Sequence, residues 1–356
     1  MSSLSHSMAM AEPRRRRRIH AIVGGGGTSS LRFAEIEMPR LKSGYDVLIE
    51  NRAVSVNVID CRIRQGLSES SLDVLGLDGA GIVRKVGPNV KHLAVGDEVY
   101  YTNEIGHTGS HAQFTAVDSR LAAMKPANLS FEEAAALPMD VVCMWQSLTE
   151  SMQIQQDCSK TILIVGATTP LGILSAQICK KFGLTVIVAI ASSKEKQGLG
   201  NVVDHFISDA GELQAQLIGI GFVDGVDFCL NTISANRLSE FVKVLKPRGH
   251  ICSLGTINKT AWQRIGVDAL YLGQISLHWL HQLVRPKQHR TGVMPVYLIL
   301  EAVRQMMEKR ILQSPAIREV SWLDFETAYD LVRSKSVVGK VVMTMNKRGG
   351  KKRVLS

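Results

Sequence analysis

The sequence of 356 residues predicts an α/β protein built from a distorted β-barrel and a doubly wound parallel sheet. Many short β-branched segments separated by glycines fill residues 19–100, which is typical of a small barrel or sandwich. Over residues 138–288, apolar strands alternate with helical segments, and this alternation predicts a parallel sheet covered by helices. The chain length and the apolar content of 45% suffice for two domains with a sizeable core.

The barrel-forming part begins with strands and ends with a helix. Strands are expected at residues 19–23, 31–37 and 46–57, followed by short strands within 73–90. The helix is expected over Phe131–Leu137, because Ser130 is a favourable N-cap and Glu133 supplies the partner of a capping box.

The parallel sheet and the return of the chain follow. Sheet strands are expected at residues 161–166, 185–191, 226–231 and 249–254. Leu245–Gly249 is expected to form a tight turn before the last of these strands. Helical spacing over 295–309 and 325–332, and a β-rich strand over 337–345, complete the chain.

The sequence Gly166–Gly172 is the strongest candidate for a binding site. It follows Ile162–Val165, an unbroken apolar strand, and precedes a helix expected over Ile173–Phe182. Backbone N–H groups and the positive end of the helix dipole at such a turn bind a pyrophosphate. The expected contacts come from Gly166, Ala167, Thr168, Thr169, Pro170, Leu171 and Gly172. Because Thr169 and Pro170 stand where a glycine-rich turn has glycines, an ordinary strand–turn–helix remains the alternative.

The residues after the second sheet strand indicate which dinucleotide binds. Ser192, Ser193 and Lys196 lie at the position where the ribose of a dinucleotide is expected. Hydroxyls and a lysine, with no acidic residue at the strand tip, favour a 2′-phosphate over a free 2′-hydroxyl. The sequence therefore predicts an NADPH site.

The net charge of +10 describes the ends of the chain. Residues 1–18 carry +4 and residues 347–356 carry +5, so both are expected to be basic tails, and the body carries only +1. No stable nucleic-acid or membrane partner is expected for the folded body. Six scattered cysteines without a C-x-x-C pair indicate free thiols in a reducing, cytoplasmic compartment. The leading Ser, Met and Arg residues leave a mitochondrial location open.

Several ordered motifs resemble the medium-chain dehydrogenase/reductases, in particular their quinone oxidoreductase-like and zinc-type alcohol dehydrogenase-like branch. The motifs are Ala53-Val-Ser-Val-Asn57-Val-Ile-Asp60, Gly76-Leu-Asp-Gly-Ala-Gly-Ile-Val83, Val95-Gly-Asp-Glu-Val99, Phe131-Glu-Glu-Ala-Ala-Ala-Leu-Pro138, Leu245-Lys-Pro-Arg-Gly249 and Val338-Gly-Lys-Val-Val342. The resemblance implies a GroES-like catalytic domain over residues 19–137 and 289–346, a Rossmann domain over 138–288, and a homodimer.

The positions that hold catalytic zinc in the alcohol dehydrogenases of this family are altered. Leu77 replaces the expected His, and Met139 stands at the junction ligand, although Asp78 and Cys61 remain. Because a tetrahedral site needs several N or S ligands, we expect no metal site. The zinc-free branches transfer a hydride from NADPH to a quinone or to an α,β-unsaturated carbonyl, and this is the expected activity.

The resemblance also implies individual site residues. Catalytic roles fall to Asn57, Asp60, Arg62 and Cys143, and further cofactor contacts fall to Asn231, Thr232, Leu254, Gly255 and Lys340. His278 and His281 are weaker candidates for the substrate pocket.

Two alternatives remain open. Cys143 replaces a Thr that is usual near the nicotinamide, and Asp209 lies near the expected 2′-phosphate, where a carboxylate would repel it. These changes leave open a catalytically weak or inactive protein that binds a nucleotide, or that binds RNA or membrane through its basic tails. The second alternative is a zinc-dependent alcohol dehydrogenase.

Overall fold

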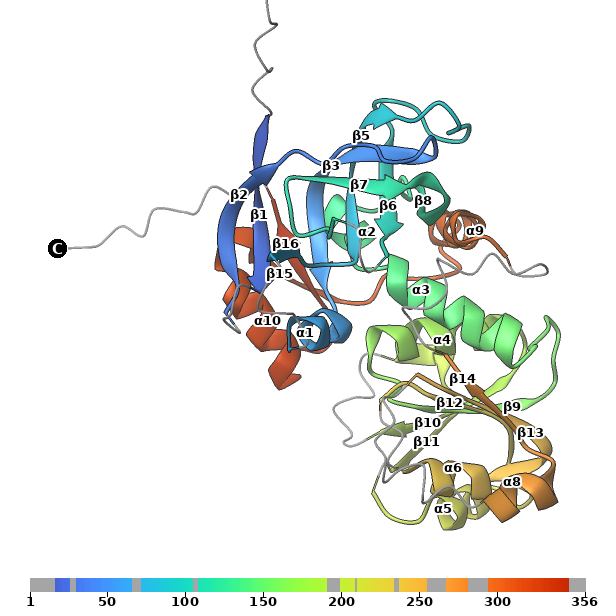
Figure 1. Ribbon diagram of the computed structural model, residues 1–356. Coiled ribbons are helices and arrows are strands. Elements are labelled where there is room, and N and C mark those ends of the chain that lie inside the picture. The colour runs from blue at the N-terminus through green and yellow to red at the C-terminus, as the bar shows by residue number, and fades with distance from the viewer. Residues whose placement is uncertain are drawn as a thin grey trace, which may run out of the picture.

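The computed structural model describes residues 17–25, 30–65, 72–104, 108–190, 199–208, 210–233, 237–254, 267–280 and 294–345. These residues form two bodies, an antiparallel barrel-like body and a parallel sheet between helices (Figure 1). The predicted fold class, a GroES-like barrel with a Rossmann sheet, is confirmed. Among the described residues, no helix combines the length and the apolar character that a membrane span requires.

The barrel-like body is organised around one long strand. The strand β3 (Asp46–Val56) pairs antiparallel with three neighbours, and its side chains are buried on both faces along most of its length. Its sheet also contains β5 (Asp78–Val86), β6 (Glu98–Thr102), β7 (Phe114–Asp118), β8 (Ala122–Met124), β15 (Ile317–Ser321) and β16 (Lys340–Thr344). A second sheet contains β1 (Arg18–Gly25), β2 (Arg32–Glu37) and β4 (Leu72–Val74).

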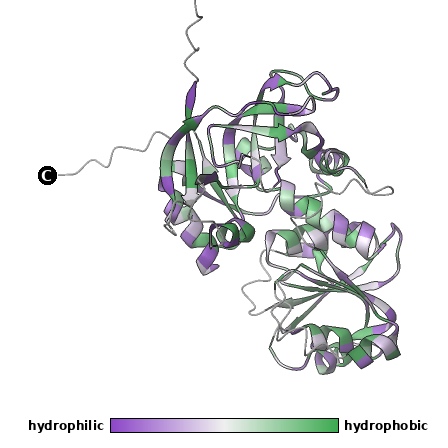
Figure 2. Cartoon of the chain, in the orientation of Figure 1, coloured by the Kyte–Doolittle hydropathy of each residue, from purple (hydrophilic) through white to green (hydrophobic). Residues whose placement is uncertain are grey.

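The parallel sheet has the strand order β11-β10-β9-β12-β13-β14. Its strands are β9 (Thr161–Val165), β10 (Thr185–Ile190), β11 (His205–Ser208), β12 (Val226–Asn231), β13 (Leu245–Ser253) and β14 (Ser276–Trp279). Because side chains alternate along a strand, Ile162 and Ile164 of β9 pack on one face while Leu163 and Val165 pack on the other. Both faces are covered by helices, and the strands are accordingly apolar (Figure 2).

Helices connect and cover these sheets. They are α1 (Val58–Gln65), α2 (Phe131–Ala135), α3 (Pro138–Trp145), α4 (Pro170–Lys181), α5 (Leu213–Gly219), α6 (Leu238–Lys243), α8 (Val267–Gly273), α9 (Val296–Glu308) and α10 (Phe325–Ser334). The predicted capping box is confirmed, since Ser130 Oγ accepts the N–H of Glu133 and the Glu133 carboxylate accepts the N–H of Ser130. A π-helical stretch, Gln146–Ser151, extends α3.

The structure corrects three local predictions. The helix after the glycine turn begins at Pro170 and not at Ile173, because proline is favourable at the first helical position and Thr169 caps it. Leu245–Gly249 is not a tight turn before a strand. It belongs to β13, where Arg248 has a φ of 65° and the pairing with β12 shifts register. The parallel sheet does not end with the strand expected at 249–254, because β14, which contains His278, pairs with β13.

Several further strands were not expected from the sequence, namely β7, β8, β11, β14 and β15. β11 and β15 are short and half polar, so they lack the apolar run that marks the central strands. The six cysteines are free thiols, as predicted. The domain boundaries remain predictions, although β16 returns to the barrel and pairs with β3.

Candidate functional site

A cavity of about 500 Å³ opens between the two bodies at the carboxyl ends of the parallel strands. From β9 the chain continues to β10 on one side, whereas β12 lies on the other side of β9. The strand order therefore reverses between β9 and β12, although the two strands are parallel. Ligands of open α/β sheets bind outside the carboxyl ends of the strands at such a switch point. The walls come from the β9–α4 turn, the ends of β12 and β13, the beginnings of α1 and α3, and residues 331–341.

The β9–α4 turn forms one wall and is closed by two threonines. The Thr169 hydroxyl donates to the Gly166 carbonyl at 2.8 Å and accepts the Gly172 N–H at 3.1 Å. The Thr232 hydroxyl lies 3.1 Å from the same carbonyl and 3.2 Å from the Thr169 hydroxyl. Thr169 therefore caps α4 from within the turn, where a glycine is usual.

The glycines at the two ends of this turn are required by its shape. Gly166 has a φ of 79°, a conformation that favours glycine. A Cβ on Gly172 would lie 2.3 Å from the Gly166 carbonyl oxygen and 2.6 Å from the Cα of Ala167, so only glycine lets the helix approach.

Two backbone donors of the turn point to an anion site. Thr168 and Leu171 both line the cavity, and none of the hydrogen bonds in the described part of the chain uses their N–H groups. They stand at the N-terminus of α4, a helix of 12 residues whose dipole favours negative charge. The turn thus keeps the anion-binding character predicted for it, despite Thr169 and Pro170.

A buried ammonium group lies on the opposite wall. Lys340 begins β16, and its Nζ donates to Asn57 Oδ1 at 2.6 Å and to Asp140 Oδ2 at 2.6 Å. All three residues line the cavity, although the Lys340 side chain is only 6% exposed. Burial alone would lower the pKa of Lys340, but the carboxylates of Asp140 and Asp78 outweigh this effect and raise it. Lys340 therefore carries a positive charge at neutral pH while the site holds no ligand.

Asn57 connects this ammonium to two further acids. Its side-chain amide donates to Asp78 Oδ2 at 3.2 Å, and its backbone N–H donates to Asp60 Oδ2 at 2.7 Å. Burial raises the pKa of Asp60 to about 7, and the charge of Asp78 adds to this effect. Burial also raises the pKa of Asp78 to about 6, against the charge of Lys340. Near neutral pH the cluster therefore holds exchangeable protons.

The mouth of the cavity combines apolar and cationic groups. Val58, Ile233 and Val338 line it and are 50%, 39% and 68% exposed. Arg62 and Lys335 also line it, and neither forms an ion pair with a described residue. An apolar ligand body with a polar end suits these surroundings.

The structure brings together about half of the predicted site residues. The cavity is lined by Asn57, Arg62, Thr168, Thr169, Pro170, Leu171, Thr232, Leu254 and Lys340. Gly166, Ala167, Gly172, Asn231 and Asp60 lie directly behind these residues and shape the turn or the acid cluster. Cys143 is buried one helical turn after Met139 and does not line the cavity. Ser192, Ser193, Lys196 and Gly255, together with Asp209 and His281, lie outside the described residues.

His278 is not part of the cavity. Its ring stacks on that of His250 with centroids 5.5 Å apart, and the two rings contact through nitrogens 3.2 Å apart. His250 lies in β13, and His278 lies in β14 at the end of the strand order.

Comparison with known proteins agrees with this geometry. Residues 43–127 match the family model described as "Alcohol dehydrogenase GroES-like domain", and residues 202–343 match "Zinc-binding dehydrogenase". A zinc-type alcohol dehydrogenase-like protein of Staphylococcus epidermidis is 26% identical over 313 residues, which cover 85% of this chain and 91% of the relative. The crystal structure of an alcohol dehydrogenase superfamily protein from Novosphingobium aromaticivorans is 26% identical with a TM-score of 0.80, and covers 92% of this chain and 99% of its own.

The chain belongs to the medium-chain dehydrogenase/reductase superfamily. It is an oxidoreductase of this type. The quinone oxidoreductase from Coxiella burnetii, at 21% identity and a TM-score of 0.75, covers 92% of this chain and 100% of its own and shares the fold.

Asp140 lines this cavity but was not predicted from the sequence as a site residue. It is the single charged residue in the apolar run from Ala134 to Trp145, and this isolation is the signal that marks it. Asp78 was considered only as a metal ligand. In the structure its carboxylate instead accepts the Asn57 amide and the Met139 N–H, the latter at 3.1 Å.

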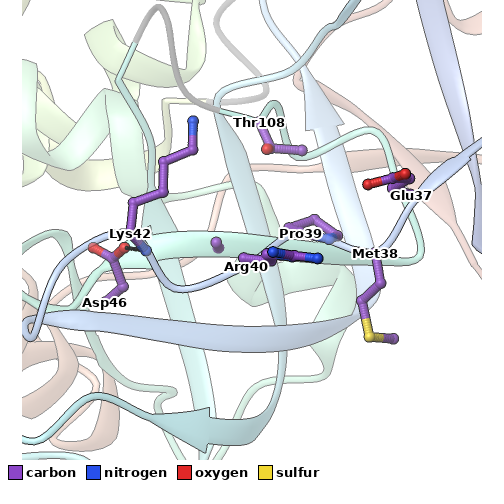
Figure 3. A pocket seen from close by; sticks show the side chains of 8 residues that line it. Glu37, Met38, Pro39, Arg40, Lys42, Asp46 and Thr108 are labelled. Atoms are coloured by element: carbon purple, nitrogen blue, oxygen red, sulfur yellow. Dashed lines mark hydrogen bonds between the residues drawn. The ribbon is translucent and has the colours of Figure 1, made fainter. Parts of the chain in front are cut away.

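A second, smaller depression of about 260 Å³ lies beside β2 and β3 (Figure 3). Its Asp46 carboxylate accepts the backbone N–H of Lys42 at 2.7 Å, while the Lys42 side chain extends away from it. None of the predicted catalytic or cofactor residues lines this depression, so the cavity between the bodies is the candidate active site.

Proposed function

We propose that the protein is a zinc-independent, NADPH-dependent reductase that transfers a hydride to a quinone or to an α,β-unsaturated carbonyl. The observation that carries this proposal is that one cavity is lined both by the N-terminus of α4 and by Lys340, whose ammonium is paired with Asp140. The first suits a dinucleotide phosphate, and the second suits an acceptor oxygen that becomes negative during reduction.

The cofactor would be held by the β9–α4 turn and by the residues that follow the strands. The N–H groups of Thr168 and Leu171 would meet its pyrophosphate, and Thr232 and Leu254 would flank it at the ends of β12 and β13. The preference for NADPH rests on the sequence of Ser192, Ser193 and Lys196. When bound, NADPH supplies the hydride.

A catalytic zinc does not fit the residues at the positions where the superfamily holds it. The Leu77 side chain has no donor atom, and Met139 offers only a thioether. The Cys61 sulfur lies 3.9 Å from the carbonyl oxygen of Tyr329 and packs there with residues of α10. Lys340 already supplies a positive charge to the neighbouring carboxylates, and a dication would be repelled by it.

The first experiment is a titration of NADPH and NADH into chelator-treated protein, followed by nicotinamide fluorescence. Micromolar binding of NADPH, weaker binding of NADH, and loss of the difference in Lys196→Glu would support the cofactor assignment. Screens of quinones and enals would then identify the acceptor class. Binding of neither nucleotide would refute the reductase, and turnover only after addition of zinc would favour an alcohol dehydrogenase.

A homodimer is also proposed. On α8, Val267, Tyr271 and Leu272 are 69%, 81% and 79% exposed. The helix packs on β13 and precedes β14, which pairs only with β13 among the described strands. A second copy that adds its own β14 would cover both features. Sedimentation velocity of Tyr271→Asp is expected to show a monomer, whereas a mass equal to that of the wild type would count against this surface.

A further inference from the structure

We propose that Lys340 donates its third N–H to the carbonyl oxygen of the acceptor, stabilises the enolate oxygen and delivers the proton of the reduction. This inference rests on the proposed reductase function and assigns to Lys340 a catalytic role toward the substrate instead of the cofactor contact expected from the sequence. It follows from the geometry of the ammonium group, its neighbours and the cavity.

The Lys340 ammonium has more hydrogen-bond donors than it uses within the protein. An ammonium group has three N–H donors. Two of them serve Asn57 Oδ1 and Asp140 Oδ2, both at 2.6 Å, and the hydrogen bonds of the described residues include no third partner. Lys340 is one of the residues that line the cavity, and we assign that remaining donor to a ligand bound there.

The Lys340 ammonium is held in a fixed position. Lys340 is the first residue of β16, and Val341 pairs with Val56 of β3, directly before Asn57. Asp140 lies in the first turn of α3, next to Met139, whose N–H is fixed by Asp78. The ammonium is therefore held by elements of both bodies and needs little reorganisation when negative charge develops.

The positive charge of Lys340 lies in surroundings that contain little water. In a largely buried site, an ammonium interacts with a developing oxyanion far more strongly than it would in water. The Lys340 side chain is only 6% exposed, and Asp140 is 9% exposed as a residue. The apolar mouth formed by Val58, Ile233 and Val338 would exclude more water once an acceptor is bound.

The chemistry balances with one hydride and one proton. Hydride addition at the β-carbon forms a C–H bond, and the electron pair of the C=C bond moves through the carbonyl group to its oxygen. The resulting enolate oxygen takes a proton from Lys340, which becomes a neutral amine and is reprotonated by solvent after the product leaves. The enol product tautomerises in water. A quinone takes up the same hydride and proton to give a hydroquinone.

The test compares Asp140→Asn with the paired variant Lys340→Met/Asp140→Asn. These two proteins differ only at Lys340, and the pair removes both charges, so that no unpaired buried carboxylate remains from this ion pair. The paired variant is expected to lower kcat for enone reduction about 100-fold or more relative to Asp140→Asn, as for loss of an oxyanion donor. NADPH affinity, measured by fluorescence, is expected to be similar in both.

A second readout needs no turnover. p-Nitrophenol mimics the enolate, and its visible absorbance reports whether it is ionised. With NADP⁺ present, the apparent pKa of the bound phenol is expected to be about one to three units lower in Asp140→Asn than in the paired variant. Equal phenol pKa values, or equal kcat values, in the two variants would overturn the role of Lys340. Absence of any NADPH-dependent turnover in the wild type would instead overturn the proposed function itself.

Discussion

Replacement of Asp60 by Asn is expected to change how stability depends on pH. Asp60 is fully buried, its Oδ1 has no partner among the described residues, and burial raises its pKa to about 7 from an ordinary 3.8. Between these two values the folded state holds a proton that the unfolded state has lost. Stability therefore falls as pH rises through this window, and the fall is complete above about pH 7.

The expected magnitude follows from the shift. About three pKa units, at about 1.4 kcal/mol per unit, correspond to about 4 kcal/mol. The free energy of unfolding of Asp60→Asn should therefore gain about 4 kcal/mol relative to the wild type between pH 4 and pH 8. Asn retains an oxygen that accepts the Asn57 N–H, so the local turn is preserved. Urea unfolding at unit steps of pH measures the difference.

A matched control is available on α10. Asp330 pairs with Arg333 at the surface and is 59% exposed, so Asp330→Asn should leave the pH dependence within about 0.5 kcal/mol of the wild type. If the curves of Asp60→Asn and the wild type run parallel from pH 4 to pH 8, folding does not raise the pKa of Asp60 and the cluster does not hold the proton assigned to it.

Two further predictions concern the ion pair and the turn. Lys340→Met alone should lower the free energy of unfolding by about 3–5 kcal/mol because it leaves Asp140 buried without its cation. Adding Asp140→Asn should restore most of this loss. If urea unfolding shows that the paired variant is as unstable as Lys340→Met alone, the reasoning is contradicted. Gly172→Ala should reduce NADPH affinity at least tenfold because its methyl group would lie 2.3 Å from a backbone oxygen of the turn, whereas Gly219→Ala, which meets nothing within 4 Å, should bind NADPH normally in the same titration.

The sequence contained enough to predict the central strands and the turn. An apolar run such as Ile162–Val165 fits only a strand buried on both faces, and glycines on either side of a helix start indicate a phosphate turn. The helix start was placed three residues late, at Ile173, although Thr169 followed by Pro170 is itself a capping signal. Local chemistry determines these features, so local sequence reveals them.

The acid and ammonium cluster could not be predicted in the same way. Lys340 and Asp140 are 200 residues apart, and their contact exists only because β16 returns to pair with β3. The motif around Lys340 suggested a cofactor contact, but only the tertiary structure shows that two side-chain oxygens hold its ammonium. Likewise, the short strand β14 lacks an apolar run and is defined by its pairing with β13.

The same cluster predicts how the reaction depends on pH. The groups around Lys340 are Asp140, which is paired with it, and Asp78 and Asp60, whose pKa values are raised to about 6 and about 7. Two further titratable neighbours of Asp60 stay neutral, because burial raises the pKa of Cys61 to about 11 and the pKa of Tyr329 well above 10.0.

As pH rises through about 7, ionisation of Asp60 adds a negative charge beside Lys340 and weakens the field that stabilises an enolate oxygen. We therefore expect kcat for enone reduction to fall through this range in the wild type, and the fall near pH 7 to disappear in Asp60→Asn. Measurement of kcat from pH 5.5 to 8.5 in both proteins tests whether Asp60 causes this fall. An identical decline in the two would mean that another group controls the reaction and that the charge of Asp60 does not reach the acceptor.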